Sequence, residues 1–275
     1  MALPFVIEPT QLAALLAQPT SKLLVIDMCA EQMYLQGHID GAIHVPPHKI
    51  LSGQPPVPGK IASVETLNRV FSFLGLTPDT HVVVYDDEGG GWAGRMIWTL
   101  DAIGHKRYSY LNGGLHAWLA SGQSVTKEVP VLTPTKTDLK IDPLVAIEIT
   151  DILGEIDRAD FVVWDARSPA EYSGERITAQ KNGHIPGAIN CEWLNLMDRN
   201  NSLRIRTDAR EYLAALGLTA NKRIITHCQS HHRSGFTYLV GKAVGLNIRG
   251  YHGSWAEWGN HPTTPVAQAI PQPME

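Results

Sequence analysis

The chain has 275 residues, 44% of them hydrophobic, and a formal net charge of −4 at pH 7. This length suits one large domain or two smaller ones, and the nearly balanced charge argues against a general nucleic-acid-binding protein. No apolar run approaches the roughly 20 residues of a membrane-spanning helix, and the N-terminal segment lacks the pattern of a secretory signal. Three widely spaced cysteines favour a reducing compartment. We therefore expect a cytoplasmic protein with no nucleic-acid or membrane partner.

The first half of the chain alternates predicted helices and strands. The continuous apolar run at residues 23–27 is typical of a buried parallel strand, and further strands are predicted at 81–85 and 108–111. Helices are predicted over 10–17, with Thr10 as the candidate N-cap, over 64–76 and over 93–103. This alternation favours an α/β fold with a parallel sheet.

The second half repeats this order, which indicates the domain organisation. The corresponding pairs are 23–27 with 161–165, 38–42 with 184–188, 64–76 with 208–218, 82–85 with 224–227, and 111–118 with 251–258. Two copies of one α/β unit explain the repeat. We predict a first domain over residues 1–124, a linker over 125–143, which shows no periodicity, and a second domain over 144–275.

The loop after the apolar run at 224–227 is the candidate site. It begins with Cys228 and continues, before a helix predicted over 236–245, with Gln229, Ser230, His231, His232, Arg233 and Ser234. A loop between a parallel strand and a helix lies at the carboxyl edge of the sheet, where its N–H groups form a cradle for anions. Such a cradle lowers the pKa of a thiol, so Cys228 is the predicted nucleophile. The alternative is that Cys228 is a small buried hydrophobic residue.

The first copy carries Asp86 where the second carries Cys228, and Asp87 and Glu88 follow it. Three carboxylates are expected to repel an anion that the second loop would attract. We therefore predict that the first copy keeps the fold without the reaction. A metal site at Asp87 and Glu88 remains an alternative, although adjacent carboxylates are usually solvated.

Four short motifs carry a resemblance to a known family: Asp165-Ala-Arg167, His184-Ile-Pro-Gly-Ala188, the cysteine loop, and the segment 251–258. With them the chain resembles the two-domain rhodaneses, which are thiosulfate:cyanide sulfurtransferases. Its loop is most similar to that of bacterial rhodaneses with the sequence Cys-Gln-Thr-His-His-Arg. The resemblance implies two tandem rhodanese-like domains, each a parallel sheet flanked by helices, with the second one catalytic.

The resemblance also implies a mechanism and roles for single residues. Cys228 would take a sulfur atom from a donor such as thiosulfate, hold it as a persulfide and pass it to an acceptor such as cyanide, without a cofactor. Arg167 would bind the charged end of the donor, or else form a structural ion pair. Arg233 would stabilise anions or brace the loop. Gln229 and Ser230 replace the Arg and Lys of mammalian-type loops, which leaves the donor open.

Three alternative functions follow from the same loop. A sulfur carrier that delivers persulfide to a partner protein would use the same thiolate. Cysteine phosphatases and arsenate reductases have a related loop, but with one more residue between Cys and Arg than the four found here. A zinc site would need His227, Cys228, His231 and His232 to converge, which adjacent histidines in a cradle loop do not favour. We therefore expect no bound metal.

Overall fold

Each half of the chain forms a five-stranded parallel sheet in the computed structural model, which describes residues 3–18 and 22–268. The strand order is β1-β5-β4-β2-β3 in the first sheet and β6-β12-β11-β7-β8 in the second, so the two halves have the same topology. All neighbouring strands within the two sheets are parallel. The predicted α/β fold with a repeated unit is confirmed.

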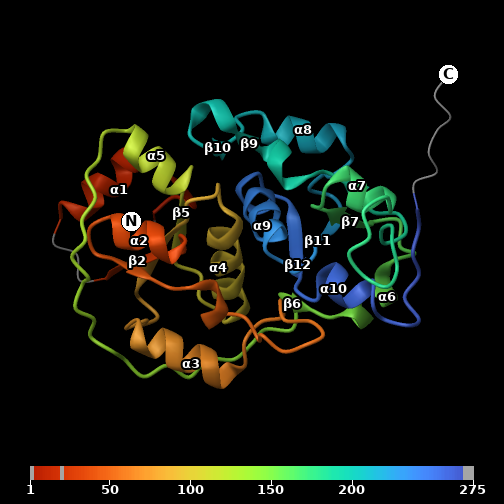
Figure 1. Cartoon of the computed structure of the whole chain (residues 1–275), viewed down its shortest axis with the longest axis horizontal. Coiled ribbons are helices and arrows are strands. Elements are labelled where there is room, and N and C mark those ends of the chain that lie inside the picture. The colour runs from red at the N-terminus through yellow and green to blue at the C-terminus, as the bar shows by residue number, and fades with distance from the viewer. Residues whose placement is uncertain (1–2, 19–21, 269–275) are drawn as a thin grey trace.

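The first sheet and its helices occupy the left half of Figure 1. Its strands are β1 Val6–Ile7, β2 Leu23–Asp27, β3 Ala42–His44, β4 His81–Tyr85 and β5 Tyr108–Leu111. Its helices are α1 Pro9–Leu16, α2 Glu31–Gln36, α3 Val64–Phe73, α4 Gly91–Ala102 and α5 Gly114–Ala120, with a 3₁₀ turn at Pro47–Lys49. The predicted N-cap of α1 was wrong, because Glu8 caps this helix in a reciprocal pair with Gln11.

The second sheet has strands β6 Ala146–Ile147, β7 Phe161–Asp165, β8 Ile189–Asn190, β11 Arg223–His227 and β12 Asn247–Tyr251. Its helices are α6 Ile149–Glu155, α7 Pro169–Ser173, α8 Ala209–Ala215, α9 Arg233–Ala243 and α10 Ser254–Trp258. A small antiparallel pair, β9 Met197–Asp198 with β10 Arg204–Ile205, lies between β8 and α8, next to 3₁₀ turns at Trp193–Leu196 and Arg199–Asn201. Helix α9 begins at Arg233, earlier than predicted, so Arg233 and Ser234 belong to its first turn.

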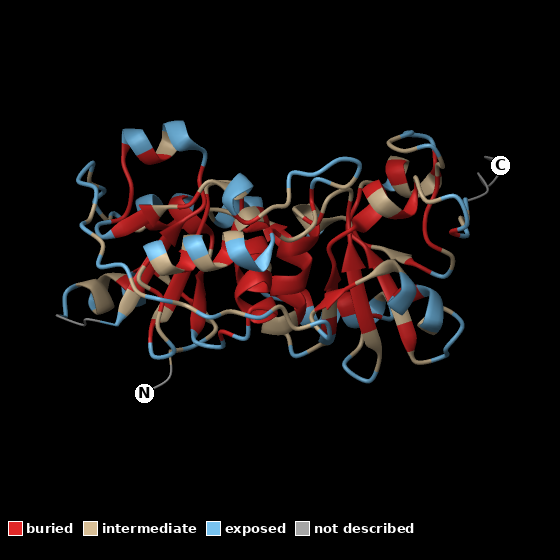
Figure 2. Ribbon diagram, turned by 90° about the horizontal axis from the view of Figure 1, so that it is seen from below, coloured by how far each residue is buried: buried red, intermediate tan, exposed pale blue. Residues whose placement is uncertain are grey.

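The two halves meet through α4 and α9, which lie side by side in the middle of the molecule (Figure 1). Figure 2 shows that these central helices are buried. A Cβ atom on Gly94 would overlap the carbonyl oxygen of Gly235, so only glycine allows this approach of the two backbones. Farther along the interface, Asp101 of α4 pairs with Lys242 and accepts a hydrogen bond from the Tyr238 hydroxyl at 2.7 Å.

The segment 125–143 contains no helix or strand and runs along α3. The Thr137 amide donates to the Ser72 hydroxyl oxygen at 3.0 Å, and the Leu139 amide donates to the Asn68 side chain at 3.0 Å. Side chains of α3 thus hold the segment that connects the two sheets. Among the described residues, no helix is both long and apolar enough to cross a membrane.

Candidate active site

Cys228 stands directly after β11, the strand that has β7 and β12 as its two neighbours. This places the loop between β11 and α9 in the middle of the carboxyl edge of the sheet, as the sequence predicts. The Cys228 N–H donates to the Ser254 hydroxyl oxygen at 3.3 Å, and its carbonyl accepts from the Trp255 N–H at 2.9 Å. The start of α10 therefore holds the backbone of the cysteine from the other side.

The surroundings of the Cys228 sulfur favour the thiolate. Burial alone would raise the pKa of this thiol, but the charge of Arg233 and hydrogen bonds from Ser234 and Ser230 outweigh it and lower the pKa below its usual value. The other two cysteines lack such a cradle. Burial raises the pKa of the Cys29 thiol far above its usual range and that of Cys191 to about 12. Cys228 is therefore the most acidic thiol of the chain.

Arg233 is braced by a carboxylate that sequence reasoning missed. Its two terminal nitrogens, Nη1 and Nη2, donate to the two carboxylate oxygens of Glu171 at 2.7 and 2.8 Å. Glu171 lies in the first turn of α7, where it forms a reciprocal cap with Ser168. Burial raises the pKa of Glu171, but Arg233 and Ser168 overcome this and lower it to about 2. The Ser-x-x-Glu pattern predicts a helix start there, but not the pairing with Arg233.

Arg167 lies in the interior of the second domain, with an exposed fraction of 0%. Its Nε and Nη2 atoms donate to the Asp165 carboxylate at 2.9 and 2.6 Å, and Nη2 also donates to the Gly183 carbonyl at 2.8 Å. The guanidinium packs over the Trp255 ring at 4.3 Å. Asp165 and Gly183 engage Nε and Nη2 in this geometry, and we propose the structural ion pair as the role of Arg167 in place of the expected contact with the sulfur donor.

Two neighbouring loops cover Gln229 and Ser230. The Gln229 side chain accepts from the Thr178 hydroxyl at 2.9 Å and donates to the Thr178 carbonyl at 3.1 Å. The first domain approaches Ser230 through Gly59, where a Cβ atom would lie 2.5 Å from the Ser230 carbonyl oxygen. Both residues are only half-buried. This part of the cradle thus lies between a loop of its own domain and a loop of the first domain.

His231 points into the interface between the domains. Its backbone has φ of 59°, in the left-handed region, and its side chain is fully buried. The Nδ1 atom lies 2.7 Å from the Ser234 hydroxyl oxygen, and the ring meets the edge of Trp98 in α4 at 4.6 Å. Burial, and next to it the charge of Arg95, lower the pKa of His231 well below its usual value. His231 is therefore neutral at physiological pH.

His232 points to different partners from those of His231. Its Nε2 atom pairs with the Glu88 carboxylate, and its ring stacks on Trp92 of α4 at 4.2 Å. Because the two histidines diverge, they do not form the convergent set that zinc requires. Glu88 also accepts from the Trp92 N–H at 3.1 Å, whereas Asp87 accepts from the Ala30 N–H at 3.3 Å. Within the described part of the chain, no cluster of three potential ligands can hold a metal ion.

The equivalent loop of the first domain holds an anion of its own, the side chain of Asp86. The Asp86 carboxylate is fully buried and accepts backbone hydrogen bonds from Glu88, Gly89, Gly90 and Ala93 at 3.2, 3.1, 2.8 and 2.9 Å. The N–H groups of this loop therefore converge on an anion, as predicted for the loop of Cys228. The cradle of the first domain is already occupied by a side chain that cannot act as a sulfur nucleophile.

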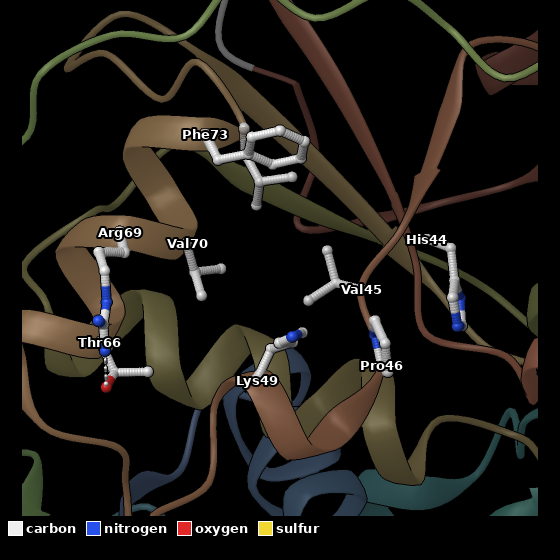
Figure 3. Close-up of a pocket in the computed structure, with 9 residues that line it drawn as sticks. His44, Val45, Pro46, Lys49, Thr66, Arg69, Val70 and Phe73 are labelled. Atoms are coloured by element: carbon white, nitrogen blue, oxygen red, sulfur yellow. Dashed lines mark hydrogen bonds between the residues drawn. The ribbon is translucent and has the colours of Figure 1, made fainter.

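A separate cavity of about 400 Å³ lies in the first domain, between α3 and the segment after β3 (Figure 3). Val45, Val70 and Phe73 give it an apolar lining, and Lys49 and Arg69 add positive charge. None of the residues that line it belongs to the loop of Cys228. The cavity therefore takes no part in the chemistry of that loop.

The chain is similar over its full length to known proteins. It is 51% identical over 268 residues to the thiosulfate sulfurtransferase of Azotobacter vinelandii, covering 96% of this chain and 97% of the relative. It is 31% identical to the sulfur carrier protein TtuD of Thermus thermophilus, covering 86% and 87%. The structure of an anaerobic ergothioneine biosynthesis enzyme from Chlorobium limicola superimposes with a TM-score of 0.84 at 20% identity, over 97% of this chain and 71% of that one.

The profile of the Rhodanese-like domain family matches the chain twice, at residues 8–121 and 148–261. These two matches fall on the two sheets of identical strand order, and the second contains Cys228. The resemblance indicated by the motifs is thus confirmed, and the chain belongs to the rhodanese-like family, with two copies of the domain in tandem.

Proposed function

We propose that the protein is a thiosulfate sulfurtransferase that uses Cys228 as its nucleophile. The Cys228 thiolate attacks the outer sulfur of thiosulfate and forms a new S–S bond. The S–S bond within thiosulfate breaks, and sulfite leaves with its electron pair. The enzyme then carries a persulfide with a negative charge on the terminal sulfur. Cyanide attacks this sulfur, leaves as thiocyanate and restores the thiolate, so two easier displacements replace one transfer.

The observation that carries this proposal is the lowered pKa of Cys228 in a cradle that offers several hydrogen-bond donors. Ser230 and Ser234 donate to the sulfur, and Arg233 places a positive charge beside it. The same donors favour an anionic persulfide, whose charge sits one bond farther out. The 51% identity to a thiosulfate sulfurtransferase over nearly the whole chain supports the choice of donor.

The braced arginine contributes through its charge. Both terminal nitrogens of Arg233 are engaged by Glu171, so the guanidinium is held in position at the start of α9. The positive charge of Arg233 and the N-terminus of this helix both favour an anion at Cys228. We therefore propose that Arg233 stabilises the thiolate and the persulfide at a distance, whereas the donors of the loop contact the sulfur.

A mass measurement tests the nucleophile and the donor together. The intact protein is weighed before thiosulfate, after thiosulfate and after cyanide. The wild-type protein should gain about one sulfur atom and lose it to cyanide, as a covalent intermediate requires. Cys228→Ala should show no gain, and Cys191→Ala serves as the matched control that keeps it. A sulfur gain on Cys228→Ala would exclude Cys228 as the nucleophile.

Delivery of the persulfide to a partner protein is the second candidate, because a relative at 31% identity is a sulfur carrier protein. The wild-type enzyme in its persulfide form, freed of thiosulfate, can be mixed with cyanide or with a thiol-bearing protein from the same cells. Faster transfer to the protein would favour the carrier. We also propose a cytoplasmic location, because Cys29, Cys191 and Cys228 are all free thiols, as expected in a reducing compartment.

A further inference from the structure

An arginine of the first domain lies buried against the loop of Cys228. Arg95 projects from α4, has an exposed fraction of 0% and packs its guanidinium over the Trp98 ring at 4.6 Å. Its Nη1 atom approaches the His231 carbonyl at 3.5 Å, which is a weak hydrogen bond. Among the described residues, its Nε and Nη2 atoms have no hydrogen-bond partner. Arg95 is therefore a buried cation that the protein leaves largely uncompensated.

Such a cation is costly unless a negative charge lies near it. The carboxylates of α4 and of the loop before it have other partners: Glu88 pairs with His232, Asp101 with Lys242, and Asp86 and Asp87 accept from backbone N–H groups. Burial lowers the pKa of Arg95 to about 9, and the Cys228 thiolate opposes this decrease. Arg95 thus remains charged at neutral pH, and the anion that acts on it is the sulfur of the second domain.

Arg95 also borders two side chains that lie next to this sulfur. The Ser234 hydroxyl oxygen lies 2.7 Å from Nδ1 of His231, and Ser234 is one of the groups that lower the pKa of Cys228. A hydroxyl has one hydrogen, so Ser234 can donate to the thiolate only if it accepts from a protonated Nδ1 of His231. The orientation of the Ser234 hydroxyl therefore depends on which ring nitrogen of His231 carries the proton.

The groups that act on the imidazole are positive or titratable, and they come from every neighbouring element. They are Arg95 of α4, His227 of β11, His232 of the loop and His252 after β12. Arg95 is the group among them that stays charged at neutral pH, because the other three are histidines. A second positive charge on His231, next to an uncompensated guanidinium in the interior, would be strongly disfavoured.

We propose that Arg95 is a positioning residue through which the first domain acts on the active site: its buried positive charge favours the Cys228 thiolate and opposes protonation of His231. This inference rests on the proposed role of Cys228 as nucleophile. Its consequence is that His231 does not gain a charge in the physiological pH range, so the electrostatic field on the sulfur stays constant there. The first domain, whose own cradle is closed by Asp86, thereby remains part of the catalytic unit.

The test is a pH titration of the Cys228 thiol, in which the ultraviolet absorbance of the thiolate measures ionisation. The absorbance of the Cys228→Ala form of each variant is subtracted. Arg95→Met removes the charge at similar length and should raise the titration midpoint by about one pH unit, a tenfold change in the ionisation constant. Arg95→Lys keeps the charge and should stay near the wild-type midpoint. Tyr238→Phe, which loosens the same interface away from the loop, is the matched control and should leave the midpoint unchanged.

A midpoint of folded Arg95→Met equal to that of the wild type would overturn the proposal. If Arg95→Met does not fold, the wild-type protein decides, because the nitrogen shifts of the His231 ring report its protonation. The ring should stay neutral, with the proton on Nδ1, between about pH 5 and pH 8; a midpoint near the ordinary histidine value would reject the inference. If the protein gained no sulfur from thiosulfate, the proposed donor would be wrong. The two titrations use no donor, so they would still test the role of Arg95.

Discussion

The replacement Glu171→Gln tests how the loop of Cys228 is held. Glu171 is 3% exposed, and both of its oxygens accept from Arg233. Gln keeps the shape of the side chain but loses the charge and one acceptor. The pKa of Glu171 falls from 4.5 to about 2 in the folded protein. A change of this size corresponds to about 3 kcal/mol of stabilisation at neutral pH, at 1.36 kcal/mol per unit.

The pH dependence of this effect has a definite sign. A carboxyl group with a lowered pKa stabilises the folded state above its unfolded pKa, and the contribution is lost as pH falls through the folded pKa. The window for Glu171 therefore extends from its ordinary value of 4.5 down to about 2. At about pH 3 the contribution should have dropped to less than half of its value at neutral pH, or roughly 1.4 kcal/mol.

Urea unfolding of the wild type and of Glu171→Gln, at neutral pH and near pH 3, measures this difference. We expect the variant to be less stable by about 3 kcal/mol at neutral pH, in the range found when one partner of a buried pair is removed. The gap should narrow on acidification, because Gln does not titrate. A difference below about 1 kcal/mol, or one independent of pH, would mean that the pair behaves as an exposed ion pair and that Arg233 is held by other contacts.

Two further replacements test the interface and the closed cradle. Asp101→Asn should destabilise the protein by about 3 kcal/mol in guanidinium unfolding at neutral pH, because it leaves Lys242 without its buried partner. Lys242 overcomes the effect of burial and lowers the pKa of Asp101. The loss of stability in Asp101→Asn should therefore shrink as pH falls through that lowered pKa, and a loss that is the same at every pH would contradict this reasoning. Asp86→Ala removes the acceptor of four backbone N–H groups and should cost about 2 kcal/mol or more. The amides of Gly90 and Ala93 should then exchange with solvent markedly faster, and unchanged exchange would show that water replaces the carboxylate at no cost.

The sequence allowed the prediction of features that depend on neighbours along the chain. The apolar runs of β4 and β11 are continuous, so each could be recognised as a buried parallel strand. Cys228 follows the second of these runs directly, and the edge at which a parallel strand ends is set by the topology alone. The repeat then indicated that the two halves share one order of elements along the chain, because each motif of one half has a counterpart in the other.

Features that depend on distant partners could not be predicted in this way. The pair of Glu171 and Arg233 joins α7 to α9, and no local pattern marks it. Arg167 lies just after a strand end, where a side chain can point to solvent or inward. Contacts with the Trp255 ring and Asp165 hold it in the interior. Arg95 lies in a helix whose buried face is set by contact with the other domain. Short strands such as β1 have too few residues to show a period.

The two cradles show what the fold contributes to the chemistry and what single residues add. The equivalent strands β4 and β11 each run into a loop that leads to a central helix. In the first domain this loop binds the Asp86 carboxylate through four N–H groups. Binding of an anion is therefore a property of the loop and does not require a thiol. At its start α9 has Arg233, whereas α4 begins with Gly91. The Asp86 carboxylate is ionised at neutral pH even though burial and Glu88 raise its pKa to about 6, but a thiol needs an adjacent positive charge to become a thiolate. Reactivity in the second domain thus depends on Cys228 together with the cations that the first cradle lacks.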